Sequence, residues 1–187
     1  MYLDIPTHHQ PDFKYGLVAR PSRKERLSIK PPAKKERKKK KSRHMANYTA
    51  SYPATVTVDE KLTDFISSFY AISDDPSRNA EWVDYFAPDA LVVIADKKAK
   101  GTEEIREMRE GMWATVTARR HVLGKVFPAV FDFHTEPPQL EYMLHGSVEQ
   151  ELKIGGKLAG DWAAHAVVRE EGGRLKYELY HVYINVR

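Results

Sequence analysis

His121 is the residue whose type and position best suit acid–base chemistry. It lies in the segment ARRHVLGKVF, directly after a predicted helix and at the start of a predicted strand. An imidazole exchanges a proton near neutral pH, so His121 is a candidate general base. The alternative is a structural histidine hydrogen-bonded to backbone at the edge of the fold. Asp74 and Asp84 are weaker candidates for a carboxylic acid, because both lie near predicted helix ends and Asp74 suits a cap or a turn equally well.

Three further histidines, His145, His165 and His181, lie on predicted strands, and a metal site is one interpretation of them. Side chains alternate between the two faces of a strand, which places all three opposite the apolar residues of their strands. No carboxylate on these strands has the spacing of a metal ligand. We therefore expect no metal, and a polar outer face that is partly exposed or forms a dimer.

The charge of the chain is divided sharply between two parts. Residues 1–44 contain 14 Lys/Arg and 4 Asp/Glu, whereas residues 45–187 contain 16 and 22, so the net charges are +10 and −6. The segment RPSRKERLSIKPPAKKERKKKKSRH has only two large apolar residues, which predicts a disordered basic tail. The tail could serve nuclear import, bind polyphosphate or solubilise the protein, or it could be an upstream extension absent from the mature chain. Because the 45–187 part is acidic, nucleic acid could bind only through the tail.

Several classes of protein are excluded by composition. The chain has no cysteine, which excludes disulfides, thiolate metal sites and a cysteine nucleophile. No apolar run approaches the ~18–20 residues that span a bilayer, and the N-terminus lacks the apolar stretch of a secretory signal. We expect a cytoplasmic protein without membrane contact, or a nuclear one if Lys38–Lys41 acts as an import signal.

From residue 57 onward, hydrophobic spacing predicts an α+β domain. Thr57 and Glu60 have the spacing of a capping box at the start of a first helix. The helices are expected at about 58–73, around Trp82 and Phe86 up to Pro88, and from Gly101 with an apolar stripe reaching Val116. The strands are expected at 91–95, 119–131, 139–154, 157–170 and 174–186, the last four forming an antiparallel meander.

The order of these elements resembles the SnoaL-like proteins of the nuclear-transport-factor-two-like superfamily, and small fungal members in particular. The segment EWVDYFAPDALVVIA, the Gly101-Thr102 helix start and the Arg120-His121 strand carry the first half of the resemblance. MLHGSVEQEL and DWAAHAVVREEGGRLKYELYHVYINV are similar to the closing strands of the family. The resemblance covers about residues 55–187, so residues 45–187 are identified as a SnoaL-like domain. It implies an α+β roll of the SnoaL-like or cystatin-like kind, in which a cone-shaped, curved antiparallel sheet wraps round three helices.

The resemblance further implies a pocket at the open end of the cone and a homodimer across the outer face of the sheet. Scytalone-dehydratase-like members carry a pocket histidine at a place similar to His121. Where a second histidine would be sought, this chain has Gln150, which cannot act as a base, and the carboxylate pair of the isomerase branch has no clear counterpart. The predicted pocket side chains, most of which could equally be core, are Tyr70, Trp82, Tyr85, Trp113, Tyr142, Gln150, Trp162 and Tyr180.

Two functions follow from the resemblance and the single candidate base. The first is a cofactor-independent lyase, isomerase or cyclase acting on a cyclic or polyketide-like metabolite, with His121 moving the proton and Tyr70 or Tyr85 orienting the ligand. A pocket rich in Tyr and Trp suits such a small, flat organic ligand. The alternative is a non-catalytic ligand-binding or dimerisation module of the same fold.

Overall fold

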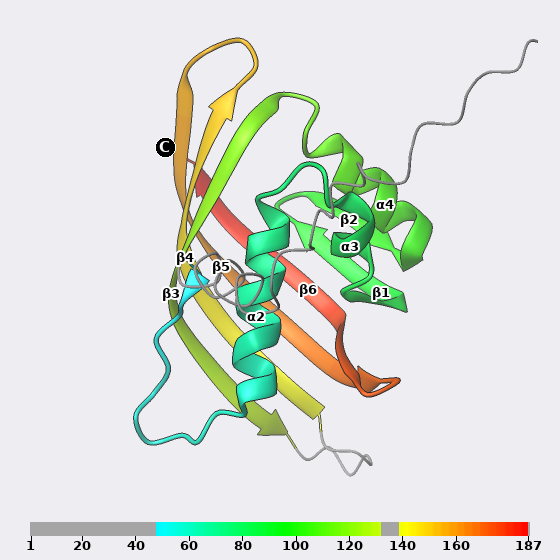
Figure 1. Ribbon diagram of the computed structural model, residues 1–187, viewed down its shortest axis with the longest axis vertical. Helices are drawn as coiled ribbons and strands as arrows, with labels where there is room; N and C mark the ends of the chain where they lie inside the picture. The colour runs from blue at the N-terminus through cyan, green and yellow to red at the C-terminus, as the bar shows by residue number, and fades with distance from the viewer. Residues whose placement is uncertain (1–47, 132–138, 187) are drawn as a thin grey trace, which may run out of the picture. The chain divides into compact units, whose positions relative to one another are not determined.

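A six-stranded mixed sheet with strand order β2-β1-β6-β5-β4-β3 is the framework of the domain (Figure 1). The computed structural model describes residues 48–131 and 139–186. The predicted basic tail, residues 1–44, therefore lies outside the described residues. The strands are β1 (Phe86–Ile94), β2 (Lys97–Lys100), β3 (Val116–Phe131), β4 (Gln139–Leu152), β5 (Lys157–Glu171) and β6 (Arg174–Val186).

Strands β3 to β6 form the predicted antiparallel meander. Their period-two alternation sets the face of each side chain, and the apolar sets are buried as expected: Leu144 and Val148 on β4, Trp162 and Ala164 on β5, Val182 on β6. One pairing differs from an all-antiparallel sheet, because β1 runs parallel to β6. Strand β1 precedes the meander in sequence. The last strand of the meander, β6, lies next to β1 and runs in the same direction.

The helices are α2 (Glu60–Ser73), α3 (Asn79–Val83) and α4 (Gly101–Gly111). The predicted capping box is wrong, since Asp59 caps α2 by accepting from the backbone N–H of Lys61 at 2.9 Å. Among the described residues no helix is long and apolar enough to span a membrane.

Three other predicted boundaries differ from the structure. Phe86 and Pro88 belong to β1 rather than to the second helix, and Val116 begins β3 rather than ending the third helix. The short β2 was not predicted, because its sequence KKAK has no apolar run and it forms only by pairing with β1.

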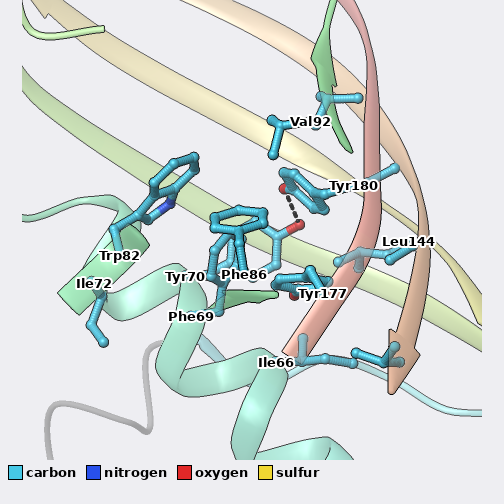
Figure 2. Packing of buried hydrophobic residues seen from close by; sticks show 14 of the residues in the cluster. Ile66, Phe69, Tyr70, Ile72, Trp82, Phe86, Val92, Leu144, Tyr177 and Tyr180 are labelled. Atoms are coloured by element: carbon cyan, nitrogen blue, oxygen red, sulfur yellow. Dashed lines mark hydrogen bonds between the residues drawn. The ribbon is translucent and has the colours of Figure 1, made fainter. Parts of the chain in front are cut away.

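Helix α2 crosses one face of the sheet, and its buried side carries the core (Figures 1 and 2). Phe69 makes ring contacts with Trp82, Phe86 and Tyr177, at centroid distances of 5.8, 5.9 and 4.8 Å. The neighbouring Tyr70 donates or accepts a 2.9 Å hydrogen bond with the hydroxyl of Tyr180 on β6. These contacts fix the C-terminal end of α2 over the sheet, where the candidate site lies.

Candidate functional site

A cavity of about 910 Å³ lies between the C-terminal end of α2, helix α4 and the α2-covered face of the sheet. A cavity of this size accommodates a drug-sized organic molecule. Six of the residues predicted from sequence line it: Tyr70, Trp82, His121, Gln150, Trp162 and Tyr180.

The other three predicted pocket residues do not line this cavity. Tyr142 is fully buried, six residues before Val148 along β4, and its hydroxyl is 2.6 Å from that of Tyr177. Tyr85 is half-buried against Phe65, with ring centroids 5.2 Å apart. Trp113 is buried behind the wall, stacked against arginine side chains. Alternation and helical spacing predict which face a residue occupies but not how far along that face the cavity extends.

His121 is paired with Asp74 inside the cavity wall. The Nδ1 atom of His121 lies 2.5 Å from Oδ1 of Asp74, and the His121 backbone N–H donates to Oδ2 at 2.7 Å. The side chain of Asp74 is 6% exposed and that of His121 is 15% exposed. The carboxylate therefore fixes both the backbone and the ring of the candidate base.

The environment of His121 favours the neutral ring. Burial lowers the pKa of His121 below its ordinary value, and the charges of Arg119 and Arg109 act in the same direction, while the hydrogen bond and charge of Asp74 oppose them. Since a carboxylate accepts, the proton of the neutral ring is assigned to Nδ1, and Nε2 keeps its lone pair. A neutral imidazole oriented in this way can accept a proton at Nε2.

Asp74 is held by three partners, two from β3 and one from the start of the described chain. Besides His121, its Oδ2 accepts from the hydroxyl of Tyr48 at 2.9 Å, and Oδ1 lies 3.7 Å from Nε of Arg119. Burial and the Asp74 carboxylate raise the pKa of Tyr48, so the phenol stays protonated and donates. A buried carboxylate with this set of donors can stabilise an imidazolium on His121.

Two buried arginines hold the end of α2 from which Asp74 projects. Arg109 is fully buried and donates to the carbonyl oxygens of Ser73, Ile72 and Asp75 at 3.0, 3.2 and 3.0 Å. Arg119 donates to the same Ser73 oxygen at 2.6 Å. Cations at a helix C-terminus bind the carbonyl groups that the helix leaves unpaired. The geometry of the His121–Asp74 pair thus depends on two residues that the sequence analysis did not assign to the site.

Aromatic rings form the remainder of the wall beside His121. Tyr70 stacks on Trp162 at 5.2 Å, and the His121 ring meets both rings edge-on, at 5.3 and 5.6 Å. Gly146 makes room for Trp162, because a Cβ there would lie 2.9 Å from its Cζ2 atom. A flat ligand in the cavity would lie beside these rings and His121.

The other titratable residues named from sequence are elsewhere. Asp84 binds Lys176 and Arg174 at 2.8 and 3.0 Å, away from the cavity wall. On the outer face, His165 pairs with Glu141 at 2.8 Å and His181 packs against Tyr183. The described residues contain no group of three or more His, Asp or Glu side chains placed to hold a metal ion.

Sequence reasoning missed the roles of Asp74, Arg109 and Arg119. A signal existed for Arg109, which is four residues after Ile105 and four before Trp113, on the apolar stripe of α4. An arginine at such a position is buried only if acceptors face it, and these come from a helix end 34 to 37 residues away.

The described fold is similar to that of solved proteins at low sequence identity. A candidate scytalone dehydratase from Novosphingobium aromaticivorans matches with a TM-score of 0.58 and 13% identity, over 67% of this chain and 82% of that one. A hexachlorocyclohexane dehydrochlorinase, LinA type 2, matches with a TM-score of 0.57 and 12% identity, over 68% and 86% of the two chains. A candidate calcium/calmodulin-dependent protein kinase II association domain from Xanthomonas campestris matches with a TM-score of 0.59 and 14% identity, over 72% and 92%.

No protein-family model matches the sequence, and no curated protein matches it. The structural matches include proteins named as enzymes and one named as an association domain. They therefore identify the fold of this chain but not its activity. The curved mixed sheet, the helix across it and these matches together show that the chain has the α+β fold of these solved proteins, the fold expected from the resemblance to SnoaL-like proteins.

Proposed function

We propose that the protein binds a small cyclic or polyketide-like metabolite and moves a proton on it with His121, as a cofactor-independent lyase, isomerase or cyclase. The observation that carries this proposal is the 2.5 Å contact between His121 Nδ1 and Asp74 Oδ1 in the wall of a 910 Å³ cavity. A neutral imidazole whose other nitrogen is bound by a buried carboxylate is suited to general-base catalysis.

The chemistry starts with the ligand stacked against Tyr70 and Trp162. His121 Nε2 takes a proton from carbon, and the imidazolium that forms is stabilised by Asp74. The imidazolium then delivers a proton to a different atom of the ligand, or to a leaving group. The two structural neighbours named as a scytalone dehydratase and a dehydrochlorinase support this class of reaction for the fold.

The test is proton exchange from carbon. The full-length chain is incubated in D2O with a panel of cyclic ketones, beginning with 2-tetralone, and deuterium uptake at the α-carbon is followed by NMR. His121→Gln should slow the exchange by about 10²–10⁴-fold, the usual contribution of a general base. His145→Gln is the matched control, because His145 lies on the outer face of β4 and should leave the rate unchanged. Equal rates for wild type and His121→Gln would reject the proposal.

The second candidate function, a ligand-binding or dimerisation module without catalysis, is favoured by a different observation. The outer face exposes large apolar side chains, among them Phe127, Met143 and Tyr183 at 49, 41 and 50%, and one structural match is named as an association domain. Panel members that raise the Tm of the chain without exchanging deuterium would support this alternative.

A further inference from the structure

Arg119 lies in the cavity wall immediately beside the His121–Asp74 pair. Its side chain is 9% exposed, and its guanidinium stacks on the Trp113 ring with Cζ 4.6 Å from the ring centroid. Nη2 is used for the hydrogen bond to Ser73 O. The stacking and this hydrogen bond hold the guanidinium in one orientation, two residues before His121 on β3.

The Nε–H group of Arg119 has no hydrogen-bond partner among the described residues, although it is shielded from solvent. Its nearest anionic atom, Oδ1 of Asp74, is 3.7 Å away and accepts from His121 instead. A buried donor without an acceptor is costly, so a bound molecule that supplies the acceptor to Arg119 Nε–H is favoured.

At least two hydrogen-bond donors around this point lack an acceptor among the described residues. Both carboxylate oxygens of Asp74 are occupied by Tyr48 and His121. In the Tyr70–Tyr180 pair only one hydroxyl can donate to the other, so one proton remains without an acceptor among the described residues. A ligand that satisfies this wall must bring an acceptor oxygen.

The buried charges favour a negative ligand. Arg109 and Arg119 are the buried charged residues of the cavity lining, and both are positive. The carboxylates that act on them, Asp74 and Asp75, lie behind the lining. Asp96, Lys97, Lys98, Glu104 and Glu107 line the mouth of the cavity. They are exposed, where water and salt screen their charges.

We propose that Arg119 binds an anionic oxygen of the bound molecule, and that the substrates are carbonyl compounds that react through their enolates. This inference rests on the proposed function. His121 Nε2 would take the α-proton, the electron pair of the broken C–H bond would form the C=C bond, and the carbonyl π electrons would move to oxygen. The resulting oxyanion accepts from the guanidinium of Arg119, and the imidazolium is paired with Asp74.

The probe that separates this inference from catalysis is 4-nitrophenol, because its phenolate absorbs at a longer wavelength than the phenol. Titrations follow the spectrum and the affinity of the bound probe for the full-length wild type and for Arg119→Gln, Arg119→Lys and Arg120→Gln. Arg120, the adjacent exposed arginine, is the matched control for the loss of one positive charge. Circular dichroism and Tm establish that each variant is folded.

We expect the wild type to lower the apparent pKa of the bound probe and to prefer the phenolate. Arg119→Gln should weaken phenolate binding by about 10- to 100-fold, the effect of losing a charge-assisted hydrogen bond. Arg119→Lys should bind with intermediate affinity, because the charge remains without the Nε donor, and it replaces Arg119→Gln as the test if the latter does not fold. Arg120→Gln should bind like the wild type.

The inference is overturned if the wild type does not bind the phenolate in preference to the phenol, or if both Arg119 variants bind it as the wild type does. His121→Gln separates the two proposals, since it should slow α-proton exchange by about 10²–10⁴-fold and still bind the phenolate. Retained exchange in His121→Gln together with Arg119-dependent phenolate binding would reject the base and leave the oxyanion site standing.

Discussion

Arg109 Nη1 donates to the carbonyl oxygen of Ser73 at 3.0 Å, joining α4 to the last residue of α2 across 36 positions of sequence. Arg109 is fully buried and also binds the Asn79 side chain, through Nε at 2.9 Å. The contact determines where α2 ends and therefore where Asp74 meets His121.

Replacing Arg109 by methionine should destabilise the protein severely. The variant keeps most of the side-chain volume but removes every donor to four buried or half-buried acceptors, so we expect a loss of at least about 3 kcal/mol in the free energy of unfolding. Urea unfolding followed by tryptophan fluorescence measures it. The control is Arg106→Met on the same helix, whose exposed ion pair with Glu103 should be worth less than about 1 kcal/mol. Equal losses for the two variants would contradict the structural role of Arg109.

Trp162 and His121 should differ in their contributions to stability. Trp162 is 5% exposed and stacks on Tyr70, so Trp162→Ala should cost about 3–5 kcal/mol and also impair ligand binding. His121→Ala removes a smaller ring and one hydrogen bond, while the backbone N–H of residue 121 still binds Asp74. We expect it to cost about 1–3 kcal/mol. Urea unfolding of both variants tests this order, and a loss for His121→Ala as large as that for Trp162→Ala would make His121 a structural residue.

The pH dependence of His121 has a definite sign. Its pKa in the folded chain is below the ordinary 6.5, mainly because of burial. Between 6.5 and the lower folded value, the unfolded chain binds more protons, so this residue lowers the free energy of unfolding as the pH falls through that window. NMR titration of the ring, assigned by its absence in His121→Gln, should give a midpoint below 6.5.

Asp74→Asn should lower that midpoint further, because Asp74 favours the protonated ring through its charge and its hydrogen bond. The same NMR titration measures the shift. A higher midpoint in Asp74→Asn would show that Asp74 does not act on His121 as an anion.

The outer face of the sheet should form a homodimer. Alternation along β4, β5 and β6 predicts Met143, His145, Ala163, His165, Val167, His181 and Tyr183 as the interface residues. Val167 is not on the exposed surface, because its side chain is only 5% exposed. A register irregularity between Val167 and Val168 interrupts the alternation of β5 at this point. Exposed apolar side chains on this face, rimmed by polar ones, are typical of a protein–protein interface.

Met143→Glu should convert the dimer into a monomer, because a charge would be buried opposite the partner. Light scattering at micromolar concentration measures the mass. Ile154→Glu is the control, since Ile154 is 94% exposed in the turn between β4 and β5 and not on this face. A monomeric wild type would end the hypothesis.

The sequence predicted the meander well because period-two alternation is a local property of each strand. Tyr180, Val182 and Trp162 are buried as their alternation requires. Local patterns did not predict β2, because this strand has no apolar run and forms only by pairing with β1. They also misplaced Phe86, because the helical spacing of apolar residues continues past the end of α3 into β1.

The site was less predictable than the fold. Residue type and family resemblance single out His121 as the candidate base, and His121 lines the cavity. Its partner Asp74 is 47 positions away, and the local sequence around Asp74 indicates a turn residue. Asp74 does occupy the C-cap position of α2, as its local sequence predicts, but the local sequence does not predict its contact with His121. Its second role depends on the contact between α2 and β3, which no periodicity encodes.

Tyr48 ties the start of the described chain to the back of the site. Its hydroxyl reaches Asp74, its carbonyl accepts from Ser67 on α2, and three residues later Ser51 pairs with Gly124 and Val126 on β3. A version of the protein trimmed to remove the basic segment should therefore retain Tyr48. Trimming beyond it would leave the Asp74 carboxylate with one donor fewer and would loosen the acid that orients the base, even though no residue of the cavity wall had been touched.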